Sequence, residues 1–200
     1  GRGKTSTLYS ALEQIRDGTK KIVPAEDPIE YHVPKINQKQ VGHSMDMPTI
    51  ARAFLRHDPD VILIGEIRDE ETAMVASRAA TTGHLVLSTL HTADALGAIS
   101  RLRALGLMET EIAEAVLAVM AQRLVRVLCD RCAEVDPDPD PRLLKVVGID
   151  PETAAQHSIK RAVGCGHCGQ VGFRGRKAIF ELMKVNTEIR DLSFNRASID

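Results

Sequence analysis

Aromatic side chains are scarce in this chain: they make up 3% of its 200 residues, and tryptophan is absent. Neither sign of charge is in excess, since the formal net charge is −1. Proteins that bind single-stranded nucleic acid combine a basic groove with aromatic rings on which bases stack. Neither feature is present, so we expect no direct contact with nucleic acid.

Long hydrophobic runs are also missing. The longest apolar stretches include Val61-Ile62-Leu63-Ile64 and Leu85-Val86-Leu87, which have the length of a strand. A helix that crosses a bilayer needs about 18 or more apolar residues in a row. The sequence therefore predicts no segment that spans a membrane.

Cysteine is limited to four residues, arranged as two C-x-x-C pairs. The pairs are Cys129 with Cys132 and Cys165 with Cys168. Four thiolates with this spacing suit a closed, tetrahedral Zn²⁺ site in a reducing compartment. The alternative is four free or redox-active thiols. His167 lies between two of the ligands, and we expect it to be a bystander.

Helices alternate with short apolar strands along most of the chain. We expect helices at 5–15 and 48–55, a helix capped by Asp69, and a helical face made by Ile112, Val116, Val119 and Met120. Strands are expected at 21–25, 61–64 and 84–89. This order predicts an α/β fold with a mostly parallel, open sheet and a ligand at the carboxyl ends of its strands.

An acidic, proline-rich stretch separates two regions of the chain. Residues 136–141 alternate aspartate with proline, which suits an extended connector. We expect a core at residues 1–128, a tetracysteine module that includes the connector at 129–176, and a C-terminal helical segment at 177–200.

The first residues read as part of a phosphate-binding loop. Glycines let backbone N–H groups point at phosphate oxygens, a lysine adds positive charge, and a threonine hydroxyl reaches Mg²⁺. The predicted nucleotide-binding segment is Gly1, Gly3, Lys4, Thr5 and Ser6. The full motif needs a further glycine upstream, so we expect the chain to be the C-terminal part of a longer protein and inactive by itself. The alternative is an ordinary glycine turn before a helix.

A second element supports the phosphate loop. In DPDVILIGEIRDEETA an apolar strand ends at Gly65 and Glu66. A P-loop enzyme keeps the acid that handles Mg²⁺ or the attacking water at such a position. Gly65 stands where an aspartate is usual, so Glu26 and Asp27, which also follow a strand, are predicted to share the metal or polarise the water.

Two histidines and two arginines complete the candidate site. His91 lies seven positions after His84, and this odd spacing turns their side chains to opposite faces of a straight strand. His91 is the better candidate for contact with the γ-phosphate, and His84 is a nucleotide contact or a structural residue. Arg56 and Arg68 are candidates for contact with phosphate or a neighbouring subunit.

The order of these motifs resembles one family, the secretion ATPases of type II secretion and type IV pilus assembly. The resemblance covers nearly the whole chain, to about Leu182. It is carried by Gly3-Lys4-Thr5 with Leu8-Tyr9, the acidic box at 26–31, LRHDPDVILIGEIRDEETA, TGHLVLSTLHTADA, AQRLVRVLC, the C-x-x-C pairs and GFRGRKAIFEL. Departures are Arg2, Pro24-Ala25 and GHSMDMPTIA.

The resemblance implies a RecA-like P-loop core in a cytoplasmic homo-hexamer that hydrolyses ATP with Mg²⁺ at the inner membrane. It implies that Lys4 and Thr5 hold phosphate and Mg²⁺, and that Glu66, Glu26 and His91 are catalytic. Implied partners are an inner-membrane platform protein and a cytoplasmic docking protein of the secretion or pilus machine.

Two other functions compete with this interpretation. The phosphate loop also occurs in P-loop kinases, although no arginine-rich lid or acceptor pocket is recognisable. A zinc-containing nucleic-acid-binding protein is the other alternative, and the low aromatic content argues against it.

Overall fold

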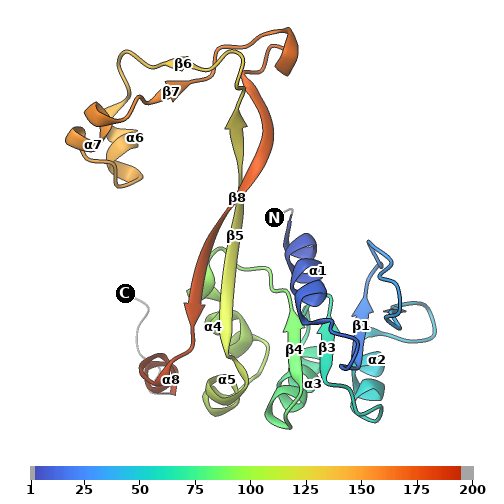
Figure 1. Cartoon of the computed structure of the whole chain (residues 1–200). Helices are drawn as coiled ribbons and strands as arrows, with labels where there is room; N and C mark the ends of the chain where they lie inside the picture. Colours follow the sequence, from blue (N-terminus) through green and yellow to red (C-terminus); the bar gives the residue numbers. More distant parts are fainter. Residues whose placement is uncertain (1–2, 195–200) are drawn as a thin grey trace. The chain divides into compact units, whose positions relative to one another are not determined.

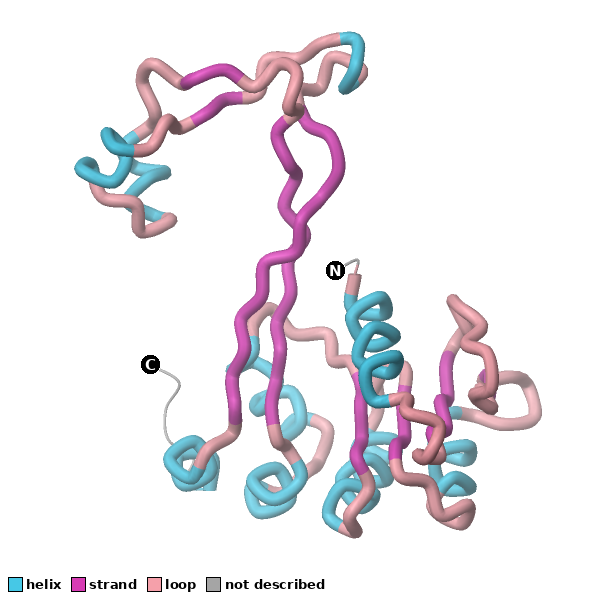
Figure 2. The backbone as a smooth tube through the Cα atoms, in the orientation of Figure 1, coloured by secondary structure: helices cyan, strands magenta, loops and turns pink. Residues whose placement is uncertain are grey.

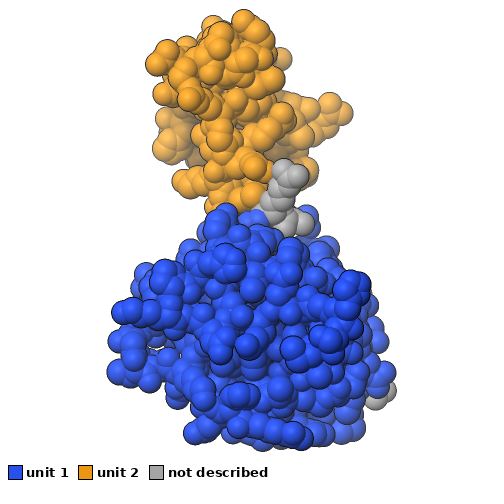
Figure 3. Space-filling view, turned by 90° about the vertical axis from the view of Figure 1, so that its right-hand side faces the viewer, with its two compact units in different colours: residues 1–123, 180–200 blue, residues 124–179 orange. Residues whose placement is uncertain are grey.

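The computed structural model describes residues 3–194 and divides into two compact units. One unit comprises residues 1–123 and 180–200, and the other comprises residues 124–179 (Figure 3). The predicted division at 1–128, 129–176 and 177–200 stays a prediction. No helix within the described residues is both long and apolar enough to span a bilayer.

The first unit is built on a four-stranded sheet. Its strands are β1 (Ile22–Glu26), β2 (Lys39–Gln40), β3 (Val61–Ile64) and β4 (Leu85–Ser88), in the order β2-β1-β3-β4. All neighbours are parallel, and β1, β3 and β4 run side by side in Figure 2. The predicted parallel α/β fold is confirmed, and β3 has the predicted bounds.

Alternating residues of β3 face two different layers of helices. Val61 and Leu63 pack with Leu12 of α1 (Lys4–Ile15) on one face. On the other face, Ile62 and Ile64 join the core that contains α2 (Met47–Phe54) and α3 (Glu70–Thr81). Both sides of this strand are buried, which explains its unbroken apolar sequence. Helices α1, α2 and α3 are labelled around β3 in Figure 1.

Aspartates cap three helices of this unit. Asp69 accepts a hydrogen bond from the Thr72 N–H at 2.8 Å, so the predicted cap of α3 is confirmed. Asp46 caps α2 and Asp94 caps α4 (Ala95–Ala104) in the same way. Each carboxylate satisfies an N–H that has no partner within the helix.

The predicted helical face through Met120 is wrong at its C-terminal end. Helix α5 (Glu109–Ala115) includes Ile112 but ends before Val116, whose backbone is extended. Val119 and Met120 lie in β5 (Ala118–Leu128), which pairs with β8 (Phe173–Lys184) in a two-stranded sheet. The strand is stabilised by a partner far away in the sequence, and local spacing carries no sign of that partner.

The strand at 84–89 is shorter than predicted, and it is less buried than β3. It covers Leu85–Ser88, and all four residues are only partly buried. The reason is its position, because β4 has one neighbour in the described sheet while β3 has two.

The second unit contains small elements. Strand β6 (Glu134–Val135) pairs antiparallel with β7 (Lys160–Arg161). Between them are helices α6 (Pro141–Val146) and α7 (Pro151–Gln156), and a 3₁₀ turn, η1, covers Gly166–Cys168. Residues 136–140 of the acidic stretch belong to no helix or strand. Helix α8 (Thr187–Phe194) belongs to the first unit.

Replacing Asp69 with alanine should lower the free energy of unfolding by about 1 kcal/mol, because the Thr72 N–H loses its acceptor. Urea unfolding followed by circular dichroism measures this change. Asp69→Asn keeps an acceptor oxygen and should lose only a few tenths of a kcal/mol. Equal losses in the two variants would show that the cap contributes nothing.

Candidate active site and metal centre

A crevice of about 280 Å³ lies at the carboxyl edge of the sheet. The start of α1 and the residues that follow β1, β3 and β4 line it. The structure brings seven of the predicted site residues to it: Lys4, Thr5, Glu26, Asp27, Glu66, Arg68 and His91. Parallel strands end at the same edge of a sheet, which is why residues far apart in the sequence meet here.

Lys4 and Thr5 open helix α1, directly after Gly3. The Lys4 ammonium donates a hydrogen bond to the Leu90 carbonyl at 2.9 Å. Burial lowers the pKa of Lys4, and the negative charge of Glu66 partly offsets this effect. Ser6 is exposed to solvent, and Gly1 lies outside the described residues. A lysine and a helix N-terminus together present positive potential to an anion.

Glu66 is held by a histidine and an arginine. Its Oε2 lies 3.0 Å from His91 Nε2, and its Oε1 is paired with the Arg68 guanidinium. Arg68 also lies 3.7 Å from Asp27 Oδ2, so it links the acids that follow β1 and β3. The hydrogen bond with Glu66 raises the pKa of Arg68 above its usual value.

Glu26 is held by neutral groups instead. Its side chain is buried, with the residue 4% exposed. The Tyr9 hydroxyl lies 2.6 Å from Glu26 Oε2, and Gln38 Nε2 donates to Oε1 at 3.0 Å. Burial raises the pKa of Tyr9, and the hydrogen bond to Glu26 raises it further.

Gly65 lets β1 and β3 come close together at the crevice. A Cβ built on Gly65 would lie 3.3 Å from the Ala25 carbonyl oxygen and 3.4 Å from Glu26 Cα. The Gly65 N–H donates to the same carbonyl at 2.8 Å, and the Gly65 carbonyl accepts from the Thr89 hydroxyl at 2.9 Å. This position, unusual as a glycine in the sequence, therefore has a structural reason.

Arg56 and His84 lie away from the crevice. Arg56 is exposed just after α2, before β3 begins. His84 precedes β4, and its Nδ1 lies 3.0 Å from the Ala79 carbonyl near the end of α3. Both residues are thus at the amino edge of the sheet, opposite the crevice, and the His84 contact is that of a structural residue.

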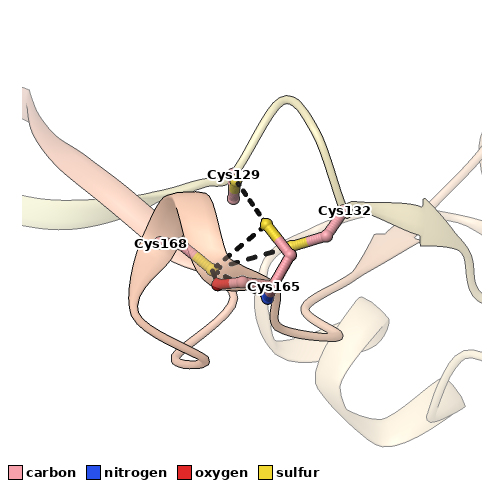
Figure 4. A group of neighbouring side chains, drawn as sticks. All are labelled: Cys129, Cys132, Cys165 and Cys168. Carbon is pink, nitrogen blue, oxygen red and sulfur yellow. Dashed lines mark hydrogen bonds between the residues drawn. The ribbon is translucent and has the colours of Figure 1, made fainter.

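The four cysteines form a separate cluster in the second unit (Figure 4). All four sulfurs lie within 4.8 Å of one another, and Cys132 to Cys168 and Cys165 to Cys168 are both 3.8 Å. A tetrahedral Zn²⁺ site with bonds of about 2.3 Å needs sulfurs about 3.8 Å apart. The donor set and its spacing fit zinc.

Backbone N–H groups point at the sulfurs of the cluster. Gly164 N donates to Cys132 Sγ at 3.3 Å, and Cys165 N and Gly172 N donate to Cys168 Sγ at 3.2 Å each. Gly164 has a φ of +117°, and an added Cβ would lie 2.7 Å from the Gln170 carbonyl oxygen. The tight backbone that delivers these N–H groups therefore requires glycine there.

The thiols of the cluster differ in acidity. Burial raises the pKa of Cys132 to about 12. Burial also acts to raise the pKa of Cys168, but the N–H donors of Cys165 and Gly172 outweigh it and lower the pKa to about 6. N–H donors of this kind favour thiolates, the form that binds metal.

Comparison with known proteins assigns nearly the whole chain to one family. The model of the family described as "Type II/IV secretion system protein" matches residues 1–199. The chain belongs to this family. Type II secretion system protein E of Pseudomonas aeruginosa is 49% identical over 201 residues, which cover 99% of this chain and 39% of that protein. The type IV pilus assembly ATPase PilB of Thermus thermophilus is 45% identical, over 95% of this chain and 22% of that protein.

Two solved structures show the same fold as this chain. The pilus retraction motor PilT with bound ADP matches with a TM-score of 0.69 and 28% identity, over 98% of this chain and 48% of that one. The VirB11 ATPase of Brucella suis, at 18% identity and a TM-score of 0.57, shares the fold alone. The present chain thus spans less than half the length of these relatives.

Sequence reasoning missed Tyr9 and Gln38 as parts of this secretion-family site. Tyr9 is one of two tyrosines in the chain, and it lies on the same buried face of α1 as Leu12, where a polar aromatic group needs a partner. The position of this tyrosine on a buried helix face therefore indicated a polar partner. Gln38 lies in an irregular segment between β1 and β2, and nothing in its surroundings marks it.

Gly65→Ala should lower the free energy of unfolding by about 1–3 kcal/mol, because the added methyl meets the backbone of β1. Thermal or urea unfolding measures the loss. The matched control is Gly42→Ala, since a Cβ there would meet nothing within 4 Å. If the two variants were equally stable, the close approach of the strands would not depend on glycine.

Proposed function

We propose that this chain is the catalytic part of a motor ATPase that drives assembly of a pilus or pseudopilus. The single observation that carries the proposal is the meeting of Lys4, Glu26 and Glu66 at one crevice. Family membership supports it, because relatives are named as type II secretion proteins and pilus assembly ATPases. The kinase and nucleic-acid-binding alternatives are not favoured by that membership.

Six of the residues that line the crevice are assigned a role in the proposed reaction. Lys4 and the N–H groups at the start of α1 bind the terminal phosphates of ATP. Glu26 orients the attacking water and acts as the general base that accepts its proton. His91, held by Glu66, contacts the γ-phosphate. Thr5, Glu66 and Asp27 offer the hard oxygen ligands that Mg²⁺ prefers, and bound Mg²⁺ would neutralise charge that develops on the phosphates.

The proposal extends to the assembly in which the chain works. We infer a RecA-like core in a cytoplasmic homo-hexamer, peripheral to the inner membrane, with a platform protein and a docking protein of the machine as partners. Arg68 is a candidate for contact with phosphate or with an adjacent subunit, and Arg56, which lies away from the crevice, is a candidate for contact with an adjacent subunit only. The similarity to secretion and pilus ATPases supports these inferences, which concern the whole protein.

Removing the Lys4 ammonium should weaken ATP binding, whereas removing the Glu66 charge should spare it. In the full chain, with any sequence that flanks residues 1–200, Glu66→Gln should bind ATP normally and lose turnover by about 100-fold or more. Lys4→Ala should lose both binding and turnover. A fluorescent ATP analogue reports binding, and phosphate release reports turnover. Normal hydrolysis by Glu66→Gln would contradict the assigned role.

We also propose that the cysteine cluster binds one structural Zn²⁺. Four sulfur ligands leave no open position for a substrate, so the metal stabilises the second unit and takes no part in hydrolysis. The spacing of the sulfurs and the N–H donors around them support this role.

Metal analysis of the purified protein should find about one zinc per chain. Cys132→Ser should release the metal and make residues 124–179 sensitive to protease, because this small unit has few buried apolar side chains of its own. His167→Ala is the matched control and should keep the zinc. A folded preparation without metal would reject the site.

A further inference from the structure

We propose that Tyr9 and Gln38 are positioning residues that hold the carboxylate of Glu26 in its catalytic orientation. The proposal rests on the function proposed above and concerns the same crevice. It adds two residues that take no part in binding phosphate or metal there.

The negative charge of the buried Glu26 carboxylate is stabilised by hydrogen bonds and by no ion pair among the described residues. Within residues 3–194 it forms no ion pair, and its two oxygens are bound by the Tyr9 hydroxyl at 2.6 Å and the Gln38 amide at 3.0 Å. Glu66, in the same crevice, is held by Arg68 and His91. A full cationic partner lowers the basicity of a carboxylate more than a neutral donor does. Neutral donors therefore orient Glu26 without placing a cation against its carboxylate.

The orientation of the Gln38 amide follows from its other contacts. The Val33 N–H donates to Gln38 Oε1 at 2.8 Å, which turns Nε2 toward Glu26. Nε2 also donates to the Tyr31 carbonyl at 2.8 Å. The segment from Tyr31 to Gln38 thus fixes one donor, and the pairing of Glu26 with Gln40 in the sheet keeps this segment beside β1.

Tyr9 provides the second donor from helix α1. Its pKa is raised by burial and by Glu26, so the phenol keeps its proton at neutral pH and remains a donor. Tyr9 lies on the same helix as Lys4 and Thr5, and its ring is mostly buried. The helix that begins at the phosphate site therefore also holds the acid that orients the water.

The test is a comparison of Tyr9→Phe with Tyr31→Phe in the full chain. Tyr9→Phe removes the hydroxyl that reaches Glu26 and keeps the ring. We expect kcat for ATP hydrolysis to fall about tenfold or more, because small displacements of a catalytic group are costly. KM and the Kd for a fluorescent ATP analogue should change by less than about twofold, because no phosphate contact is lost.

Tyr31→Phe is the matched control. The Tyr31 ring packs edge-on against Tyr9 with centroids 5.6 Å apart, and Tyr31 contributes only its backbone carbonyl to the network. Its side chain is exposed, so this variant should keep the wild-type kcat. Gln38→Met removes the other donor and should resemble Tyr9→Phe. If Tyr9→Phe unfolds below the assay temperature, Gln38→Met alone tests the proposal.

The outcomes separate this inference from the proposed function. Wild-type kcat in both Tyr9→Phe and Gln38→Met, with Lys4→Ala inactive, would overturn the positioning role alone. Parallel losses of kcat and nucleotide affinity in these variants would also overturn it, because they would indicate a general structural role. Normal turnover by Lys4→Ala would instead overturn the proposed function itself.

Discussion

The parallel pairing of β1, β3 and β4 is the constraint on which the rest of the site depends. Their register places Ala25 beside Ile64, and Ile64 beside Ser88. The next residues along each strand therefore emerge at one edge, and they include Glu26, Glu66 and, three residues after Ser88, His91. This alignment brings two acids that are 40 residues apart in the sequence to the crevice that also contains Lys4, at the start of α1.

The two acids at this edge lie in different electrostatic environments. Glu66 is paired with the Arg68 guanidinium and lies 3.0 Å from His91 Nε2. Glu26 is buried and bound only by neutral donors, which suits a group that acts on water. Neighbouring carboxylates can take different chemical roles when their surroundings differ in this way.

The strand ends could be predicted from the sequence because two-sided burial leaves a clear pattern. Val61-Ile62-Leu63-Ile64 is apolar throughout, so the position of Glu66 followed directly. The capping aspartate at 69 was equally visible, since its signal is local. Clustering of Glu26 with Glu66 required only the further assumption of a parallel sheet.

What could not be predicted depends on contacts between distant segments. Val119 and Met120 have helical spacing but pair with β8, whose sequence lies more than 50 residues later. Gln38 reaches Glu26 only because an irregular segment folds back along β1. His84 was predicted to be either a nucleotide contact or a structural residue, and only the end of α3 shows that its ring contacts a helix carbonyl.

An experimental structure of the full chain with a non-hydrolysable ATP analogue tests the central claim most directly. The account predicts that the terminal phosphate lies against Lys4 and the start of α1, with Glu26 and Glu66 facing it across the crevice. A triphosphate bound elsewhere, for example in the lysine-lined pocket at the amino edge near Lys35 and His57, would contradict it.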